Sequence, residues 1–122
     1  MDSFRMYATA DGESHFAELE LDYQATSATV ARTSPIGASN VSFNRVRPGM
    51  VLDWHHAPRR QYVFVLAGEY ELEVSDGAVR RVVPGTVFLA EDLSGKGHIM
   101  RVPENEEVYI AFVPLEDQRP TS

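Results

Sequence analysis

Strict alternation of charged and apolar residues is the feature that most limits the folds open to this chain. From Glu18 to Tyr23, every second residue is a carboxylate and the residues between them are apolar or aromatic. Residues 69–74 repeat the pattern. In an extended strand, this period of two places the carboxylates in water and the apolar side chains on a buried sheet face, whereas a helix would scatter them around its axis. We therefore predict β-strands over both segments.

Five further segments are rich in the β-branched and aromatic residues that favour strands. They cover residues 41–46, 61–66, 79–83, 86–89 and 108–113. Pro-Gly, Asp-Gly and Gly-Lys-Gly turn signals separate these segments, and Asp76-Gly77 is the strongest hairpin signal because both central residues of a type I′ turn need positive φ. No segment of about a dozen residues has the pattern of an amphipathic helix. The chain is therefore predicted to be an all-β antiparallel sandwich or barrel.

The length of 122 residues fits one domain with a sizeable core. We expect a single domain over 1–122, with its core at about 41–113. Residues 1–12 are expected to form an N-terminal arm. The polar segment 116–122 is expected to be a frayed tail.

The charge balance and the absence of cysteine exclude several classes of protein. Eleven Lys and Arg residues against eighteen Asp and Glu residues give a net charge of −7, which argues against nucleic-acid binding. Without cysteine there are no disulfides, thiolate nucleophiles or cysteine zinc sites. No apolar stretch approaches the roughly 18 to 20 residues that cross a bilayer, and the first residues do not resemble a signal peptide. We expect a soluble, cytoplasmic domain that binds no membrane.

Two segments differ from a generic β pattern. Residues 48–61 contain the run Asp-Trp-His-His-Ala-Pro-Arg-Arg-Gln, and residues 84–98 begin with Pro-Gly and end with Gly-Lys-Gly-His. Polar, potentially metal-binding side chains here adjoin strands with apolar interiors. Such a pattern is typical of a barrel mouth that holds a small ligand.

These segments resemble the two motifs of the cupin superfamily. The first cupin motif is Gly, five residues, His, one residue, His, three or four residues, Glu, six residues and Gly, and Gly49, His55 and Gly68 fit its spacing. The second has a Pro-Gly turn, a strand and a later His, which Pro84-Gly85 and His98 resemble. The chain also looks like small single-domain bacterial cupins with a Gly-Lys-Gly-His segment. The resemblance covers about 41–113 and implies a double-stranded β-helix, or jelly-roll, barrel.

The metal motif is degenerate. Ala57 stands where the family places its second His, and Gln61 stands where it places Glu, so only His55 and His98 carry over unchanged. His56 is one residue out of phase with His55 and faces the other side of a regular strand. The resemblance implies a weak divalent site (Fe, Mn, Ni or Zn) at His55, Gln61 and His98, or no metal at all.

The candidate catalytic residues are two histidines and two loop residues. A histidine side chain changes charge between about pH 5 and 8 and suits acid or base catalysis, and the resemblance places His55 and His98 on the inner barrel face. Glu91 and Lys96 lie in the polar, Gly-rich segment before His98 and are candidates for an acid or base and an anion contact.

Five residues are candidate ligand contacts. Trp54 and Met100 are candidates for the apolar wall of the cavity, and Gln61 for an orienting hydrogen bond. Arg59 is a candidate anion contact at the mouth. Arg45 is a candidate inward-pointing residue in the strand before the first motif.

Two functions from different classes remain. The first is an enzyme that moves protons on a small organic molecule in an isomerisation, cyclisation or elimination, with a metal as Lewis acid or oxygen activator if one binds. The alternative is a non-catalytic binding or sensing cupin that has lost its metal site. Resemblance to small cupins also implies a homodimer, which would cover edge strands.

Overall fold

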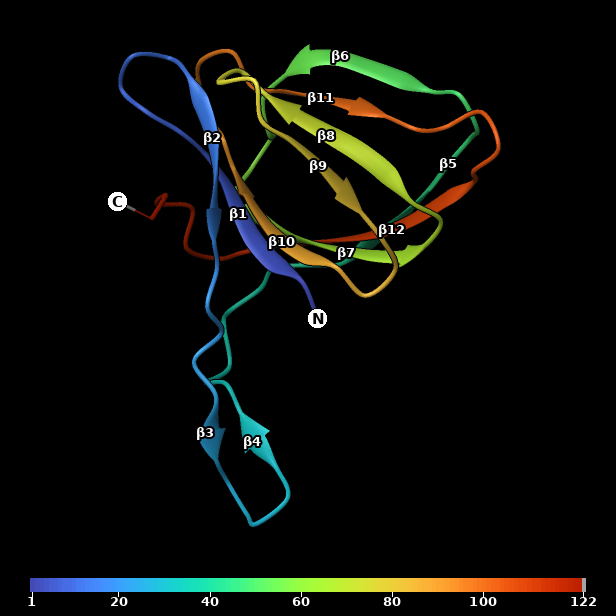
Figure 1. Cartoon of the computed structure of the whole chain (residues 1–122). Helices are drawn as coiled ribbons and strands as arrows, with labels where there is room; N and C mark the ends of the chain where they lie inside the picture. The colour runs from blue at the N-terminus through green and yellow to red at the C-terminus, as the bar shows by residue number, and fades with distance from the viewer. Residues whose placement is uncertain (122) are drawn as a thin grey trace.

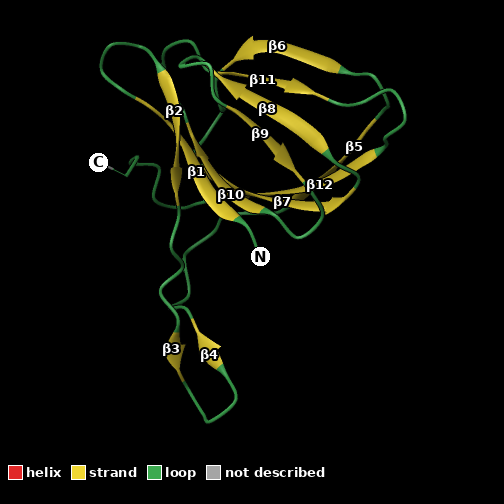
Figure 2. Ribbon diagram, viewed as in Figure 1, coloured by secondary structure: helices red, strands yellow, loops and turns green. Residues whose placement is uncertain are grey.

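The computed structural model describes residues 1–121, which form two sheets folded into a barrel and one small projecting hairpin (Figures 1 and 2). The larger sheet has the strand order β2-β1-β10-β7-β12-β5, and the smaller one has the order β6-β11-β8-β9. The strands of the larger sheet are β1 (Ser3–Ala8), β2 (Ser14–Glu18), β5 (Ser42–Val46), β7 (Gln61–Ala67), β10 (Val87–Glu91) and β12 (Val108–Pro114). Those of the smaller sheet are β6 (Val51–His55), β8 (Tyr70–Val74), β9 (Val79–Val82) and β11 (His98–Arg101). The all-β jelly-roll prediction is confirmed, and residues 1–121 include no helix that could cross a membrane.

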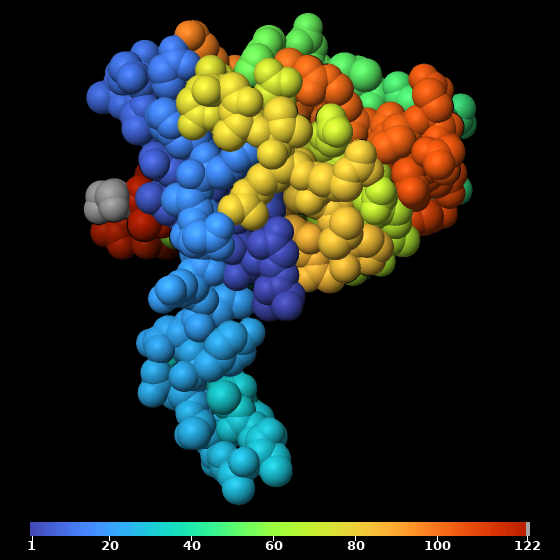
Figure 3. All heavy atoms as spheres, viewed as in Figure 1, coloured from blue at the N-terminus to red at the C-terminus, as the bar shows by residue number. Residues whose placement is uncertain are grey.

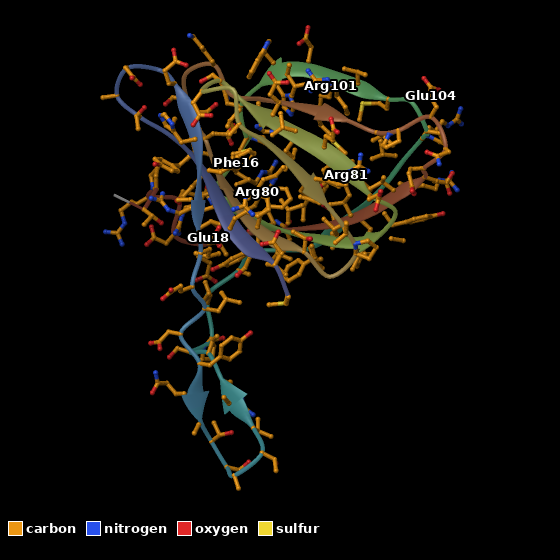
Figure 4. All side chains as sticks on the ribbon, in the orientation of Figure 1. Phe16, Glu18, Arg80, Arg81, Arg101 and Glu104 are labelled. Carbon is orange, nitrogen blue, oxygen red and sulfur yellow. The ribbon has the colours of Figure 1, made fainter. Side chains whose placement is uncertain are left out.

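Alternate residues of the facing strands fill the space between the sheets. Val63 and Val65 from β7 are buried, as are Leu72 and Val74 from β8, so the period-two pattern of each strand supplies one layer of the core. Arg80 of β9 links the sheets at their open side: its guanidinium lies 4.4 Å from the centre of the Phe4 ring and donates to Glu18 at 2.7 Å (Figure 4). The barrel thus has an apolar interior, and the charged side chain of Arg80 joins the edges of its two sheets.

The predicted strand over 18–23 is wrong beyond Glu18, where β2 ends. Residues 19–23 leave the sheet and lead into a hairpin of β3 (Gln24–Ala25) and β4 (Ala31–Arg32), which stands clear of the barrel (Figures 1 and 3). Alternation predicted an extended backbone, but it does not reveal whether a sheet edge is available to pair with it.

Residues 1–12 are not an arm. Strand β1 lies inside the larger sheet, antiparallel to β2 and parallel to β10, and the side chains of Phe4 and Met6 are fully buried. The Phe4 ring stacks on Phe88 with 5.0 Å between ring centres. This segment therefore belongs to the core, which the expected range of 41–113 omitted.

The C-terminal segment is anchored rather than frayed as far as it is described. The side chain of Gln118 donates to the carbonyl oxygens of Arg60 and Leu115, and the Thr121 N–H donates to the Glu91 carboxylate at 3.0 Å. Ser122, the end of the predicted tail, lies outside the described residues.

The turn at Asp76-Gly77 joins β8 to β9 as predicted, but it is not type I′. Gly77 has a φ of 94°, whereas no residue other than glycine has positive φ in the described part of the chain. The Gly77 N–H donates to the Val74 carbonyl at 3.1 Å and the Val74 N–H donates to the Ala78 carbonyl at 3.0 Å. A type I turn followed by a left-handed glycine satisfies this pattern, so only Gly77 needs positive φ.

Candidate functional site

A cavity of about 150 Å³ lies between the two sheets. Its wall is mainly apolar and includes Met100 from β11, as predicted for that residue's position, and Phe112 from β12. Five lining residues carry hydrogen-bonding side chains: Asn44, His55, Gln61, Tyr70 and His98. An apolar chamber with a few converging polar groups is the usual form of a small-molecule site.

A second, wider hollow of about 450 Å³ forms the mouth of this cavity. Six residues line both spaces, and His55 and Gln61 are among them, so these two side chains lie where the hollow meets the cavity. His56 and Arg59 line only the hollow and are exposed. Arg59 therefore lies at the entrance to the barrel, which is the position predicted for a residue that contacts an anion.

The structure brings together the two histidines that the cupin motifs singled out. His55 of β6 and His98 of β11 are cross-strand partners, and their ring centres lie 4.2 Å apart. The His98 side chain is nearly buried, and His55 is half-buried. More than forty residues separate them in the chain, and the antiparallel pairing of β6 with β11 brings them side by side.

Each imidazole is held through its Nδ1 atom. The Nδ1–H of His55 donates to the Asp53 carbonyl at 2.7 Å, which leaves Nε2 of the neutral ring with its lone pair. Burial lowers the pKa of His55, although the bond to the Asp53 carbonyl and the nearby Asp92 carboxylate act in the opposite direction. His55 is therefore a neutral base near pH 7.

Asp92 orients the second histidine and was missed by the sequence analysis. Its carboxylate oxygen Oδ2 lies 2.6 Å from Nδ1 of His98, and its side chain is fully buried. The other oxygen, Oδ1, has no hydrogen-bond partner among the described residues. A buried carboxylate behind an imidazole fixes its tautomer and stabilises its protonated form. The sequence signal was the adjacent pair Glu91-Asp92, because two consecutive residues of an extended chain point to opposite sides and one of the two carboxylates therefore faces inward.

Glu91 faces the other side of β10, and its assignment as a catalytic residue is corrected. Its buried carboxylate accepts hydrogen bonds from Arg5 at 3.1 Å, Arg60 at 2.9 Å and the Thr121 N–H. Burial alone would raise the pKa of Glu91, but the bonds from Thr121, Arg60 and Arg5 outweigh it and hold the pKa below its usual value. Glu91 anchors the C-terminal segment instead.

Three other predicted site residues lie away from the cavity. The Lys96 ammonium, mostly exposed, pairs with Glu13. Arg45 is exposed beside Tyr109 on the outside of the larger sheet. Trp54 is 45% exposed and does not line the cavity.

Trp54 is the neighbour of His55 in β6, so regular alternation places its side chain on the opposite face of the strand, and a β-bulge in β6 explains the position of Leu52 instead. The pairing of β6 with β11 changes register between His98 opposite His55 and Met100 opposite Leu52, so β6 contains one extra residue there. Side-chain alternation restarts after the bulge, and Leu52 and His55 both line the cavity although three positions separate them. Regular alternation would have placed them on opposite faces.

The side chains present fit a resident metal poorly. No three His, Cys, Asp or Glu side chains are grouped to hold an ion within residues 1–121. Ala57, at the position of the family's second His, lines the cavity with a methyl group, and Gln61 supplies a neutral amide instead of a carboxylate. Two imidazoles and an amide are a weak donor set for the divalent ions named above.

Solved structures with a similar fold include several cupins. The polyketide cyclase RemF from Streptomyces resistomycificus aligns with a TM-score of 0.55 and 19% identity over 69% of this chain, which spans 58% of the RemF chain. A cupin domain from Bordetella pertussis aligns with a TM-score of 0.49 and 19% identity, and the alignment covers 70% of this chain and 100% of that domain. KdgF from a Halomonas species aligns with a TM-score of 0.44 and 23% identity, and the alignment covers 91% of this chain and 96% of KdgF. No family model and no curated protein matches the sequence.

The protein has the cupin fold. The barrel of two facing sheets and the motif spacing around His55 and His98 agree on this point. Sequence identities below 25% to these structures show a shared fold and not a shared reaction, so the chemistry is argued from this chain's own residues.

Proposed function

We propose that the barrel binds a small, mainly apolar organic molecule and catalyses proton transfer on it, in an isomerisation, cyclisation or elimination. The single observation that carries the proposal is the Asp92–His98 pair beside His55 at the wall of an apolar cavity. An apolar cavity of about 150 Å³ accommodates a molecule the size of benzene. A larger substrate would extend its polar end into the mouth, where Arg59 can meet an anionic group.

His98 is the proposed general base. Its Nε2 lone pair takes a proton from a carbon next to a substrate carbonyl, and the Asp92 carboxylate stabilises the imidazolium that forms. The Gln61 amide donates a hydrogen bond to the enolate oxygen, and Nε2 of neutral His55 accepts one from a substrate hydroxyl. Where the substrate has a carbon–carbon double bond next to the deprotonated carbon, the electron pair extends over it as a dienolate, and return of the same proton from His98 to the far carbon moves the double bond and completes an isomerisation with no net gain or loss of protons.

RemF is described as a polyketide cyclase, which supports including cyclisation among the candidate reactions. The non-catalytic alternative rests on Ala57 and Gln61, which replace two of the family's metal ligands. A binding or sensing protein would keep the cavity and lose the chemistry.

Deuterium exchange distinguishes these two functions whatever the net reaction is. The protein is incubated in D₂O with a panel of small aryl ketones, and proton NMR follows loss of the signal next to the carbonyl. We expect exchange above background, slowed by about 10²- to 10⁴-fold in His98→Gln and in Asp92→Asn. The matched control is Lys96→Ala, which removes a polar group from the same loop but outside the cavity and should exchange at the wild-type rate.

Binding of the ketones, followed by native mass spectrometry, gives the second readout. Binding without exchange, or equal exchange by wild type and His98→Gln, would contradict the catalytic proposal. The first of these outcomes would support the binding protein instead.

A further inference from the structure

The inner end of the cavity carries a polar group that the proposed chemistry does not use. Five polar side chains line the cavity, and three of them, Asn44, His55 and Gln61, also line the mouth. The other two, His98 and Tyr70, line the cavity alone. Tyr70 is 1% exposed and is the largest fully buried side chain in the described part of the chain. Its hydroxyl therefore belongs to the interior of the barrel.

Strand register places Tyr70 well beyond the histidine pair. His98 of β11 lies opposite Val74 of β8, and Tyr70 is four residues from Val74 along the same strand. At roughly 3.3 Å per residue, these two positions of β8 are about 13 Å apart. Both side chains are buried, as every second residue of β8 is, so both face the interior. One cavity reaches Tyr70 and His98, so a molecule that fills it lies between a phenol and an imidazole.

The backbone that carries Tyr70 is held on both sides. Strand β8 lies between β9 and β11 in the smaller sheet, and Tyr70 pairs with Val82 of β9, which is also fully buried. A side chain that packing already fixes keeps its hydroxyl in place before a ligand arrives. Little ordering is then lost when the ligand binds.

No hydrogen bond from the described residues accounts for the Tyr70 hydroxyl. Burial raises the pKa of Tyr70, and burial is the only influence on that pKa. By contrast, the hydroxyl of Tyr109 on the outside of the barrel donates to Glu107 at 2.7 Å. A buried tyrosine hydroxyl normally has a hydrogen-bond partner, and one without a partner costs stability. Phenylalanine would fill the same part of the wall without this cost, so packing alone does not account for the oxygen atom.

We propose that the Tyr70 hydroxyl donates a hydrogen bond to a second oxygen atom of the bound molecule, at the end opposite the carbonyl group that faces Gln61. This inference rests on the proposed function, because the molecule is the one bound between the two sheets. It narrows the substrate class to cyclic or aromatic ketones that carry an oxygen acceptor across the ring, such as a second carbonyl, an ether or a hydroxyl.

The surroundings of Tyr70 suit an uncharged acceptor. Because burial raises its pKa, the hydroxyl stays protonated at neutral pH and can donate. The wall around it is apolar, and no Lys or Arg of the described chain lines the cavity. A carboxylate at this end would lose its hydration without gaining a counter-charge. An anionic group of the substrate therefore stays at the mouth, where Arg59 lies.

Two ketones of nearly the same shape test the hydrogen bond directly. 4-Methoxyacetophenone carries an oxygen atom across the ring, and 4-ethylacetophenone has a methylene group in its place. Titrations followed by NMR give the affinity of wild type and of Tyr70→Phe for each ketone. We expect Tyr70→Phe to lower the ratio of the two affinities, methoxy over ethyl, by about 10-fold, which corresponds to the loss of one buried hydrogen bond.

Urea unfolding separates this role from a structural one. Under the proposal, Tyr70→Phe is at least as stable as wild type, because it loses a buried oxygen atom that has no partner. A hydroxyl that supports the barrel would instead make the variant less stable and weaken the binding of both ketones by the same factor. The matched control is Tyr109→Phe, which removes the same atom from the outside of the barrel and should leave the affinity ratio unchanged.

The deuterium-exchange assay distinguishes failure of this inference from failure of the proposed function. Exchange of both ketones that depends on His98, together with equal affinity ratios in wild type and Tyr70→Phe, would overturn the inference and leave the proposed function standing. If neither ketone binds to wild type, both are overturned. A lower affinity ratio in Tyr70→Phe, with stability retained, supports the inference.

Discussion

Gly97 lies behind the histidine pair, and replacing it with alanine should damage both the fold and the site. Its φ is 75°, in the left-handed region, and a Cβ added there would lie 2.1 Å from the carbonyl oxygen of His55 and 2.6 Å from the backbone nitrogen of His56. These are backbone atoms, so no side chain can rotate away. The end of β6 would have to move by about 1 Å to reach ordinary van der Waals separation.

The expected cost has two parts. Left-handed backbone costs an alanine about 1–2 kcal/mol. Displacing β6 from β11 disrupts about two backbone hydrogen bonds, each worth roughly 0.5–1.5 kcal/mol. We expect Gly97→Ala to lower the free energy of unfolding by roughly 2–5 kcal/mol in all, or the melting temperature by about 8–20 °C.

Gly77→Ala is the matched control. Gly77 has a φ of 94° with no atom within 4 Å of the added Cβ, so it should lose only the backbone part, about 1–2 kcal/mol. Both variants are unfolded by urea and by heat at one protein concentration, since dimerisation would otherwise shift the comparison. Imidazole NMR signals should move for His55 and His98 in Gly97→Ala alone. Equal losses of stability in the two variants, with unchanged histidine signals, would refute the reasoning.

Three further predictions concern pH, metal binding and exposed residues. Because the pKa of Glu91 is lowered on folding, its contribution to stability is present above the unfolded value of about 4.3 and is lost as pH falls through the folded value. Glu91→Gln should therefore be less stable than wild type by about 3–5 kcal/mol at pH 7, and urea unfolding at pH 3.5 should show a smaller difference. Ala57→His adds a third imidazole to the cavity wall and should bind Zn²⁺ at least about 10-fold more tightly than wild type by calorimetry; equal affinity would show that Ala57 does not face the histidine pair. Trp54→Ala should leave ketone binding within about twofold of wild type, because Trp54 points away from the cavity, and a large loss would place it back in the wall.

Much of the fold could be predicted because it depends on local patterns. Strand β8 follows the alternation of residues 69–74, and β7, β9, β10 and β12 match their β-branched segments to within a residue or two at each end. The spacing around His55 and His98 was enough to predict that the two imidazoles meet, since motif spacing carries strand pairing with it.

The assignments that failed depended on which side of a strand faces the cavity. Glu91 at the end of β10 and Asp92 directly after it are adjacent carboxylates that point to opposite sides of the chain, and Trp54 faces away from the cavity because it neighbours His55 in β6. A shift of one residue reverses the direction of every later side chain in a strand, so a local pattern cannot decide it.

The sequence by itself determined that this chain forms short strands around an apolar interior, with two histidines in cupin-like positions and too few strong donors for the family's usual metal site. Only the tertiary structure decided that Asp92 supports His98, that β1 completes the core and that residues 22–36 project as an arm. Hydrophobic periodicity is encoded by neighbouring residues, whereas the direction of a side chain and the partner of a strand depend on packing between segments far apart in the chain.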